Sequence, residues 1–166
     1  MITEPTNKQE WKIHLEKFDV WNERLLFAYF ATFGRPPSII DIGCGTGAMV
    51  KLARLNGIEA VGIDLIEMEP PDITHDLEKP IDLGKKYGLV ICLEVVEHIS
   101  EFNADVILRT IQNHAHKNGM LLFSAAHPGQ GGDHHKNLQS AKYWRSMLFH
   151  RGMNYREDIT NRMRIA

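Results

Sequence analysis

The alternation of apolar and polar residues divides the chain into helix-like and strand-like segments. Through residues 7–33 apolar residues recur at steps of three and four, which predicts helix. A break is expected near Asp19 to Asn22, and Gly34 with the following prolines ends the helix. Apolar runs predict strands at 38–43, 59–64, 72–75, 87–94 and 120–126, and amphipathic patterns predict helices at 46–56, 101–117, with Ser100 as N-cap, and 139–151.

The strand-like runs are typical of a parallel sheet. The run at 87–94 is almost continuously apolar, as expected for a strand that is buried on both faces. The order β-α-β-β-α-β favours an α/β fold, namely a doubly wound, mostly parallel Rossmann-like sheet with helices on both faces. Ligands of such sheets bind beyond the carboxyl ends of the strands. Five polar side chains fall at those ends: Asp41, Asp64, Asp76, Glu94 and His127.

Composition narrows the class of protein. The chain has 166 residues, is 43% hydrophobic and carries a net charge of −2, which predicts one globular domain and argues against a polyanion binder. No apolar run reaches the roughly 18–20 residues of a membrane span, and the N-terminus lacks a signal-peptide pattern. The two cysteines, Cys44 and Cys92, suggest no disulfide framework. We therefore expect a cytoplasmic protein without a membrane partner.

The clearest chemical signal is the stretch Asp41–Gly47, which reads D-I-G-C-G-T-G after the first strand. Glycines at alternate positions let a ligand approach the backbone in front of a helix N-terminus. Dinucleotide sites usually read G-x-G-x-x-G, and Asp41 would repel a pyrophosphate but attract an ammonium group. Asp64 follows about twenty residues later, where such folds place a ribose-binding acid. This pattern favours S-adenosylmethionine over NAD as the ligand.

These residues resemble the class I S-adenosylmethionine-dependent methyltransferases, and the likeness covers about residues 38–150. It implies a single domain over 1–166, with an N-terminal helical cap (1–37), a cofactor-binding sheet (38–155) and a polar tail (156–166). Trp11, Phe18 or Trp21 of the cap are candidates to roof the site, although packing against the sheet is the simpler role. The implied cofactor-binding residues are Asp41, Gly43, Cys44, Gly45 and Gly47 at the methionine end, Asp64 and Leu65 near the ribose, Asp76 and Leu77 near the adenine, and Leu93 and Glu94 at the methyl-donor side.

A second motif, Glu-x-x-Glu-His, follows the fourth strand. If it forms a helical turn, Glu94, Glu97 and His98 share one face. It resembles a motif of ubiquinone-biosynthesis O-methyltransferases and of small-RNA terminal 2′-O-methyltransferases, where acids and histidines hold a divalent metal that polarises the acceptor hydroxyls. The implied ligands are Glu94, Glu97 and His98, with His127, His134 or His135 as the fourth, for Mg, Mn, Fe or Zn. In metal-free relatives the same residues bond backbone or substrate, and this arrangement is the favoured one.

A glycine-rich loop at 127–139 leaves the fifth strand and should overhang the acceptor pocket. His127 and His135 are candidate general bases for the acceptor, with His98 as the third. Adjacent His134 and His135 cannot both point inward on an extended loop, and a surface position is the alternative for each histidine. The loop resembles that of small bacterial and phage methyltransferases at His135, Asn137, Gln139 and Tyr143-Trp144.

The C-terminal segment departs from the resembled family. Class I methyltransferases close the sheet with an antiparallel hairpin, whereas only Met153–Tyr155 could start a sixth strand here, so the hairpin is short or absent. Because an open sheet edge is prone to pairing, we expect a homodimer partner or the tail to cover it. The basic excess after Lys136 is typical of a solvated helix face, although it would also suit an acidic acceptor.

The resemblance therefore implies methyl transfer from S-adenosylmethionine to a small-molecule acceptor, with oxygen as the favoured atom. One alternative is an RNA or DNA methyltransferase, and a metal-assisted 2′-O-methyltransferase is one form of it. Against it stand the missing recognition domain, the missing aromatic platform and the net negative charge. The other alternative is a catalytically idle subunit that binds the cofactor within an assembly.

Overall fold

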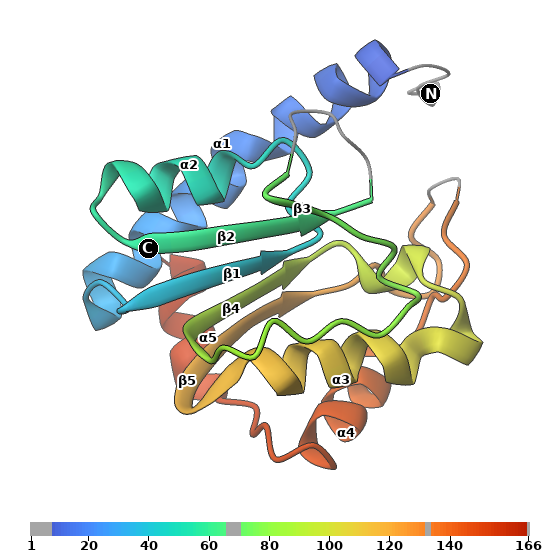
Figure 1. The fold of residues 1–166 in the computed structure, drawn as a ribbon. Helices are drawn as coiled ribbons and strands as arrows, with labels where there is room; N and C mark the ends of the chain where they lie inside the picture. Colours follow the sequence, from blue (N-terminus) through green and yellow to red (C-terminus); the bar gives the residue numbers. More distant parts are fainter. Residues whose placement is uncertain (1–7, 66–70, 132–133, 166) are drawn as a thin grey trace.

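The computed structural model describes residues 8–65, 71–131 and 134–165, which form a parallel sheet between two layers of helices (Figure 1). The sheet has the order β3-β2-β1-β4-β5, and every neighbouring pair is parallel. The strands are β1 (Ser38–Ile42), β2 (Glu59–Asp64), β3 (Ile73–Thr74), β4 (Tyr87–Leu93) and β5 (Ala115–Ser124). The helices are α1 (Lys8–Phe33), α2 (Ala48–Leu55), α3 (Ala104–His114), α4 (Ala141–Phe149) and α5 (Glu157–Ile165), with 3₁₀ turns η1 (Val96–His98) and η2 (Glu101–Asn103).

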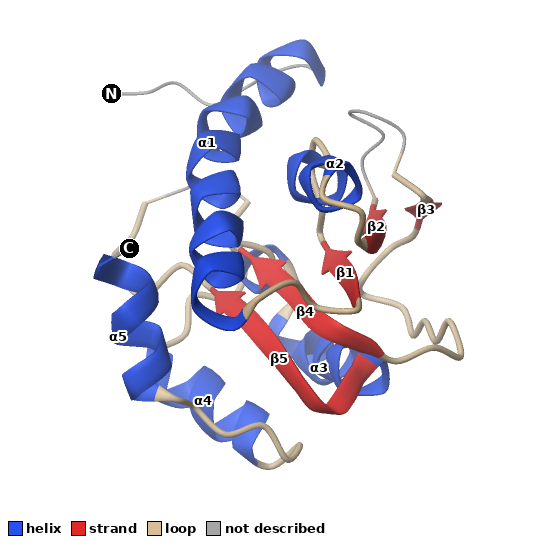
Figure 2. Cartoon of the chain, turned by 90° about the vertical axis from the view of Figure 1, so that its left-hand side faces the viewer, coloured by secondary structure: helices blue, strands red, loops and turns tan. Residues whose placement is uncertain are grey.

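Side-chain alternation along the central strands divides the core into two clusters. Ile39, Leu89 and Ile91 pack with α1, α2 and α5, whereas Ile40 and Val90 pack with α3 and α4 on the opposite face. Figure 2 shows α1 and α3 on opposite sides of the strands. Because successive side chains of a strand point to opposite faces, Asp41 has the same orientation as Ile39. Asp41, the acid of β1, therefore faces the layer of α1 and α2. The doubly wound α/β fold is confirmed.

The N-terminal helix differs from its prediction. α1 is continuous from Lys8 to Phe33, so the break expected near Asp19 to Asn22 is wrong. Phe18 and Trp21 are 47% and 67% exposed, and neither lines the cavity described below; the side chain of Trp11 lies outside the described residues. Polar residues in the middle of this helix mark a face turned toward a pocket, as described below, and not a helix end.

Two boundaries on the α3 side also differ. Residues 101–103 form the 3₁₀ turn η2 and α3 begins at Ala104, while Ser100 makes no side-chain capping bond. α3 ends at His114, and β5 begins at Ala115 where the sequence predicted helix to 117 and strand from 120. The polar run His116–Asn118 conceals this early start, since it resembles a helix end more than a strand.

The C-terminal part adds helices to the sheet and no strand. Met153–Tyr155, which could have started a sixth strand, lies in a loop, and β5 is one of the two outer strands of the sheet that the described residues form. The polar tail forms α5, and its Ile159 and Met163 pack on the cluster that includes Leu89 and Ile91. The tail thus covers a face of the sheet, and a homodimer through β5 stays a prediction.

Within the described ranges, no helix combines the length and the apolar character that a membrane crossing needs.

Candidate functional site

The glycine loop after β1 folds back on β2 through backbone hydrogen bonds. The amides of Gly43 and Cys44 donate to the Ile63 carbonyl at 2.8 and 3.1 Å, and the Gly47 amide donates to the Cys44 carbonyl at 2.8 Å. Gly43, Gly45 and Gly47 have φ values of 82°, 54° and 72°, a region that residues with a Cβ rarely adopt. The alternating glycines are therefore required by the backbone path.

Gly43 has a second reason to lack a side chain. A Cβ on this residue would lie 2.3 Å from Cγ2 of Val95, in the segment after β4. The glycine loop and the β4 end thus approach each other directly, because the central strands β1 and β4 are neighbours. Any ligand that lies along this loop is also next to the segment that carries Glu94, Glu97 and His98.

Asp41 is a buried carboxyl group. It is 4% exposed, and burial, reinforced by the charge of Asp64, raises its pKa to about 7. No cation of the described residues is among the causes of that shift. A cationic ligand group would therefore stabilise the ionised form of Asp41.

The acids Asp64 and Asp76, at and just after the ends of β2 and β3, accept hydrogen bonds from loop amides. The Gly45 amide donates to Asp64 Oδ2 at 2.8 Å, which ties the ribose-binding candidate to the glycine loop. Asp76 accepts from the Glu78 amide at 3.0 Å, and this bond together with Lys79 lowers its pKa. Leu65 is 59% exposed, whereas Leu77 is buried in the core. Contacts of these four residues with ribose and adenine stay predictions.

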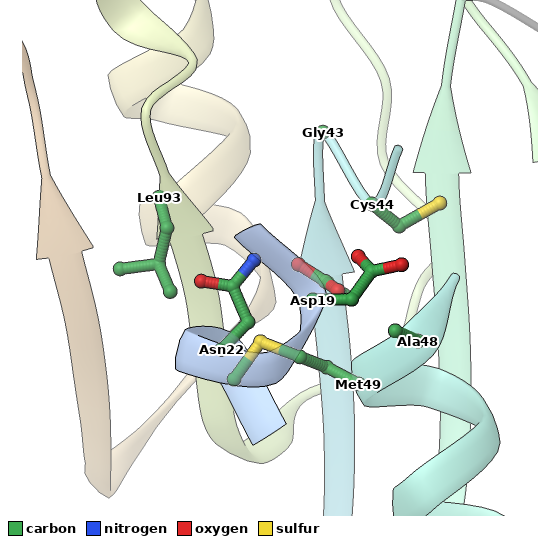
Figure 3. A pocket seen from close by; sticks show the side chains of 8 residues that line it. Asp19, Asn22, Gly43, Cys44, Ala48, Met49 and Leu93 are labelled. Atoms are coloured by element: carbon green, nitrogen blue, oxygen red, sulfur yellow. The ribbon is translucent and has the colours of Figure 1, made fainter. Parts of the chain in front are cut away.

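A small cavity of about 20 Å³ lies between the glycine loop, the β4 end and α1 (Figure 3). Figure 3 shows Asp19 and Asn22 of α1 reaching toward the loop that carries Gly43 and Cys44. The Thr46 hydroxyl donates to the Asp19 carboxylate, 2.9 Å from each oxygen. The lining residues are Asp19, Asn22, Asp41, Gly43, Cys44, Ala48, Met49 and Leu93.

Four of these lining residues were predicted as cofactor contacts: Asp41, Gly43, Cys44 and Leu93. The sequence interpretation missed Asp19 and Asn22. Their only sequence signal was a pair of polar residues three apart in an otherwise amphipathic helix, which favoured a break. Residues at this spacing lie on one helix face, so a common polar partner of Asp19 and Asn22 was an alternative to a helix break.

The segment after β4 turns sharply at Glu94, which has a φ of 53° and donates its amide to Ser124 Oγ at 3.1 Å. Glu94 therefore precedes the 3₁₀ turn at Val96–His98 and is exposed, while Glu97 is fully buried. The helical turn that the shared face required does not include Glu94, but the Glu94 carboxylate still lies close enough to act on the pKa of Glu97 and of His98. A non-glycine residue in this conformation is uncommon and clusters at functional sites.

Glu97, His98 and His135 form the strongest cluster of metal-ligating side chains in the described part of the chain. One ligand atom from each lies within 4.8 Å of the others, and the rings of His98 and His135 are 4.9 Å apart. Glu97 Oε1 accepts from the Ala126 amide at 3.2 Å, while buried Glu97 Oε2 and His135 Nδ1 have no hydrogen-bond partner among the described residues. Unsatisfied buried atoms of this kind are rare and point to a missing partner.

The electrostatics of this cluster suit a cation or a polar substrate. Burial, then the charge of Glu94, raises the pKa of Glu97 to about 7. Burial, then His135, lowers the pKa of His98, which favours its neutral imidazole. A carboxylate oxygen and two imidazole nitrogens are a donor set that divalent transition metals accept, so the residues present fit a metal ion.

The other two histidines of the loop lie outside this cluster. His127 is exposed, and its Nδ1 is 2.9 Å from the Pro128 carbonyl oxygen. His134 is exposed while His135 is half-buried, which confirms that only one of the adjacent pair points inward. The loop reaches the cluster because the amides of Lys136 and Asn137 donate to the Glu97 carbonyl at 2.7 and 3.0 Å. The structure thus favours His135 over His127 beside Glu97 and His98.

The fold and the site together define the class of protein: a Rossmann-like α/β domain with a ligand pocket and a second polar cluster at the carboxyl edge of its sheet. Residues 14–164 match the profile of a family described as "Methyltransferase domain". The chain therefore belongs to this methyltransferase family, as its resemblance to class I methyltransferases predicted.

Curated relatives carry a narrower name. A ubiquinone biosynthesis O-methyltransferase of Rickettsia prowazekii is 29% identical over 99 residues, covering 52% of this chain and 38% of the relative. The mitochondrial ubiquinone biosynthesis O-methyltransferase of Arabidopsis thaliana is 34% identical over 96 residues, covering 46% of this chain and 30% of the relative. The chain thus spans 30% to 38% of the length of these relatives.

Solved structures show the same fold. A SAM-dependent methyltransferase from Archaeoglobus fulgidus superimposes with a TM-score of 0.67 at 19% identity, covering 87% of this chain and 74% of that one. Magnesium protoporphyrin IX methyltransferase from Synechocystis PCC 6803, with bound SAM, gives a TM-score of 0.61 at 19% identity, covering 90% and 75%. At these identities the likeness concerns the fold alone.

Proposed function

We propose that this protein transfers a methyl group from S-adenosylmethionine to a hydroxyl oxygen of a small molecule. The observation that carries the proposal is the direct approach of the glycine loop to the β4 end, where Gly43 leaves no room for a Cβ beside Val95. This approach brings a pocket with a buried acid next to the segment of Glu97 and His98. Family membership, the named relatives and the SAM-bound neighbour support the same assignment.

The predicted cofactor-binding residues each have a defined task under this proposal. Asp41 attracts the ammonium group of the methionine end, the glycine loop offers its backbone to the ligand, and Asp64 accepts from the ribose hydroxyls. Leu93, which lines the cavity, borders the methyl-donor side. The sulfonium already is a reactive electrophile, so much of the rate comes from holding donor and acceptor in line.

Glu97, His98 and His135 act on the acceptor side. We propose that these three residues hold a divalent cation; when bound, it would lower the pKa of an acceptor hydroxyl. Where no cation is bound, the His98 imidazole, whose pKa burial lowers, is suited to accept the hydroxyl proton. Buried Glu97 orients the cluster, because its side chain and its carbonyl accept amides of Ala126, Lys136 and Asn137.

The proposal is tested by incubating the purified protein with labelled S-adenosylmethionine and a panel of phenols, catechols and aliphatic alcohols, with Mg²⁺, Mn²⁺ or Zn²⁺ and with EDTA. We expect turnover of hydroxylated acceptors that EDTA reduces. Methylation of the 3′-terminal nucleotide of an RNA, with no turnover of the small molecules, would favour the 2′-O alternative and contradict a small-molecule acceptor. Tight binding of S-adenosylhomocysteine without turnover of any acceptor would favour the idle-subunit alternative.

Substitution of His135 by alanine is expected to weaken Zn²⁺ or Mn²⁺ binding, measured by calorimetry, by about hundredfold or more, since changes even in the outer shell of metal sites cost 10–100-fold. Turnover should fall with it. The His127→Ala variant should keep its metal affinity, and His116→Ala, which removes an exposed histidine on β5, serves as the control. If His127→Ala loses the metal and His135→Ala retains it, the assignment of the cluster is wrong.

A further inference from the structure

The cavity beside the glycine loop has a wall that the loop itself does not supply. Asp19 and Asn22 come from α1, and Figure 3 shows Asn22 between Leu93 and Asp19. They are three residues apart on one helix and therefore project from the same face. A helix that precedes the sheet in the chain thus places a carboxylate and an amide in the same cavity as Asp41.

Asp19 is fixed in this position by the glycine loop. The Thr46 hydroxyl lies 2.9 Å from both oxygens of the Asp19 carboxylate, and Thr46 is only 6% exposed. A hydroxyl has one hydrogen to donate, so this contact leaves most of the acceptor capacity of the carboxylate unused. The packed geometry presets Asp19 for a further donor without a rearrangement of α1.

The ligand of the proposed function has the complementary groups. Its amino-acid end carries one ammonium and one carboxylate on the same carbon, so a site that binds it needs an acceptor and a donor close together. The Asp19 carboxylate is an acceptor only, whereas the Asn22 amide offers two N–H donors. Asp41, which lines the same cavity, is a second acceptor for the ammonium group.

We propose that α1 recognises the amino-acid end of the cofactor, with Asp19 accepting from its ammonium group and Asn22 donating to its carboxylate. The inference rests on the proposed function, because it requires a nucleoside with an amino-acid tail. It makes α1 a part of the binding site and not only a cover of the sheet. The glycine loop and α1 are then joined twice, by the Thr46 hydroxyl and by the ligand.

Calorimetric titration with three ligands separates these contacts. S-adenosylhomocysteine has both groups, decarboxylated S-adenosylmethionine keeps the amine alone, and 5′-methylthioadenosine lacks both. Asp19→Asn should weaken the first two by roughly tenfold or more, the usual effect of losing a charged hydrogen bond. Asn22→Ala should weaken only S-adenosylhomocysteine. Neither variant should change the affinity for 5′-methylthioadenosine.

Glu23→Gln is the matched control. Glu23 lies one turn after Asp19 and lines the groove between α1 and α2, but not the cavity. Its charge contributes to the raised pKa of Asp19 without lining the cavity, so its removal should change the three affinities far less than Asp19→Asn does. Equal weakening of all three ligands by Asp19→Asn would show a merely structural role, and no weakening would show no role; either result overturns the inference. If the unaltered protein binds neither 5′-methylthioadenosine nor S-adenosylhomocysteine, the proposed function itself fails.

Discussion

Substitution of Gly43 by alanine is expected to abolish measurable binding of S-adenosylhomocysteine and to lower the free energy of unfolding by about 2–4 kcal/mol. Two costs add at this position. The backbone has a φ of 82°, which disfavours any residue with a Cβ, and the new methyl group would lie 2.3 Å from Val95 Cγ2. The loop and the β4 end must then separate, and the cavity between them loses its shape. Calorimetry and denaturant unfolding measure the two effects.

Gly34 provides the control for backbone strain. Its φ of 77° is similar, but nothing lies within 4 Å of a Cβ placed on it, and it is in the connection between α1 and β1. Gly34→Ala should cost only about 1–2 kcal/mol and leave ligand binding intact. The double variant Gly43→Ala with Val95→Ala should recover part of the lost stability, because it removes the clash and leaves the strain. Full ligand binding by Gly43→Ala would contradict the proposed packing of the loop.

The fold was predictable because its main signals are local. The strands β1, β2 and β4 are short apolar runs, and runs of this kind mark parallel strands buried on both faces. The boundaries that failed depend on distant partners. Asp19 and Asn22 resemble a helix break until the glycine loop, 27 residues after Asp19, is packed against them. A local pattern contains no information on such a partner.

The candidate site also has one part that the local sequence predicted and one part that depends on distant contacts. The glycine loop with Asp41 is one contiguous motif, so the sequence predicted the cavity residues that it contributes. The choice among His127, His134 and His135 depends on the path of a loop. That path is set by the amides of Lys136 and Asn137 on the Glu97 carbonyl, a contact across the fold. Spacing alone therefore left three candidates, and the packing of the loop places His135 against His98.

Asp41 should make the ligand-free protein less stable as the pH rises. Burial raises the pKa of Asp41 to about 7 in the folded state, above the value of about 3.9 in an unfolded chain. The folded state therefore binds this proton more tightly. Its contribution to stability is complete below about pH 4 and is lost as the pH rises toward 7. Over this range the loss is roughly 4 kcal/mol as an upper bound.

Asp41→Asn removes this ionisation, so the ligand-free variant is expected to unfold at a higher temperature than the unaltered protein above pH 7. The difference should shrink toward pH 4, where Asp41 is protonated in both states. With S-adenosylhomocysteine the order should reverse at pH 8, because the variant loses the charge that attracts the ammonium group. Thermal unfolding between pH 4 and 8, with and without the ligand, measures both effects. If the ligand-free variant were the less stable protein at pH 8, the Asp41 carboxylate would have a partner within the chain. Its part in holding a cationic ligand would then have no electrostatic basis.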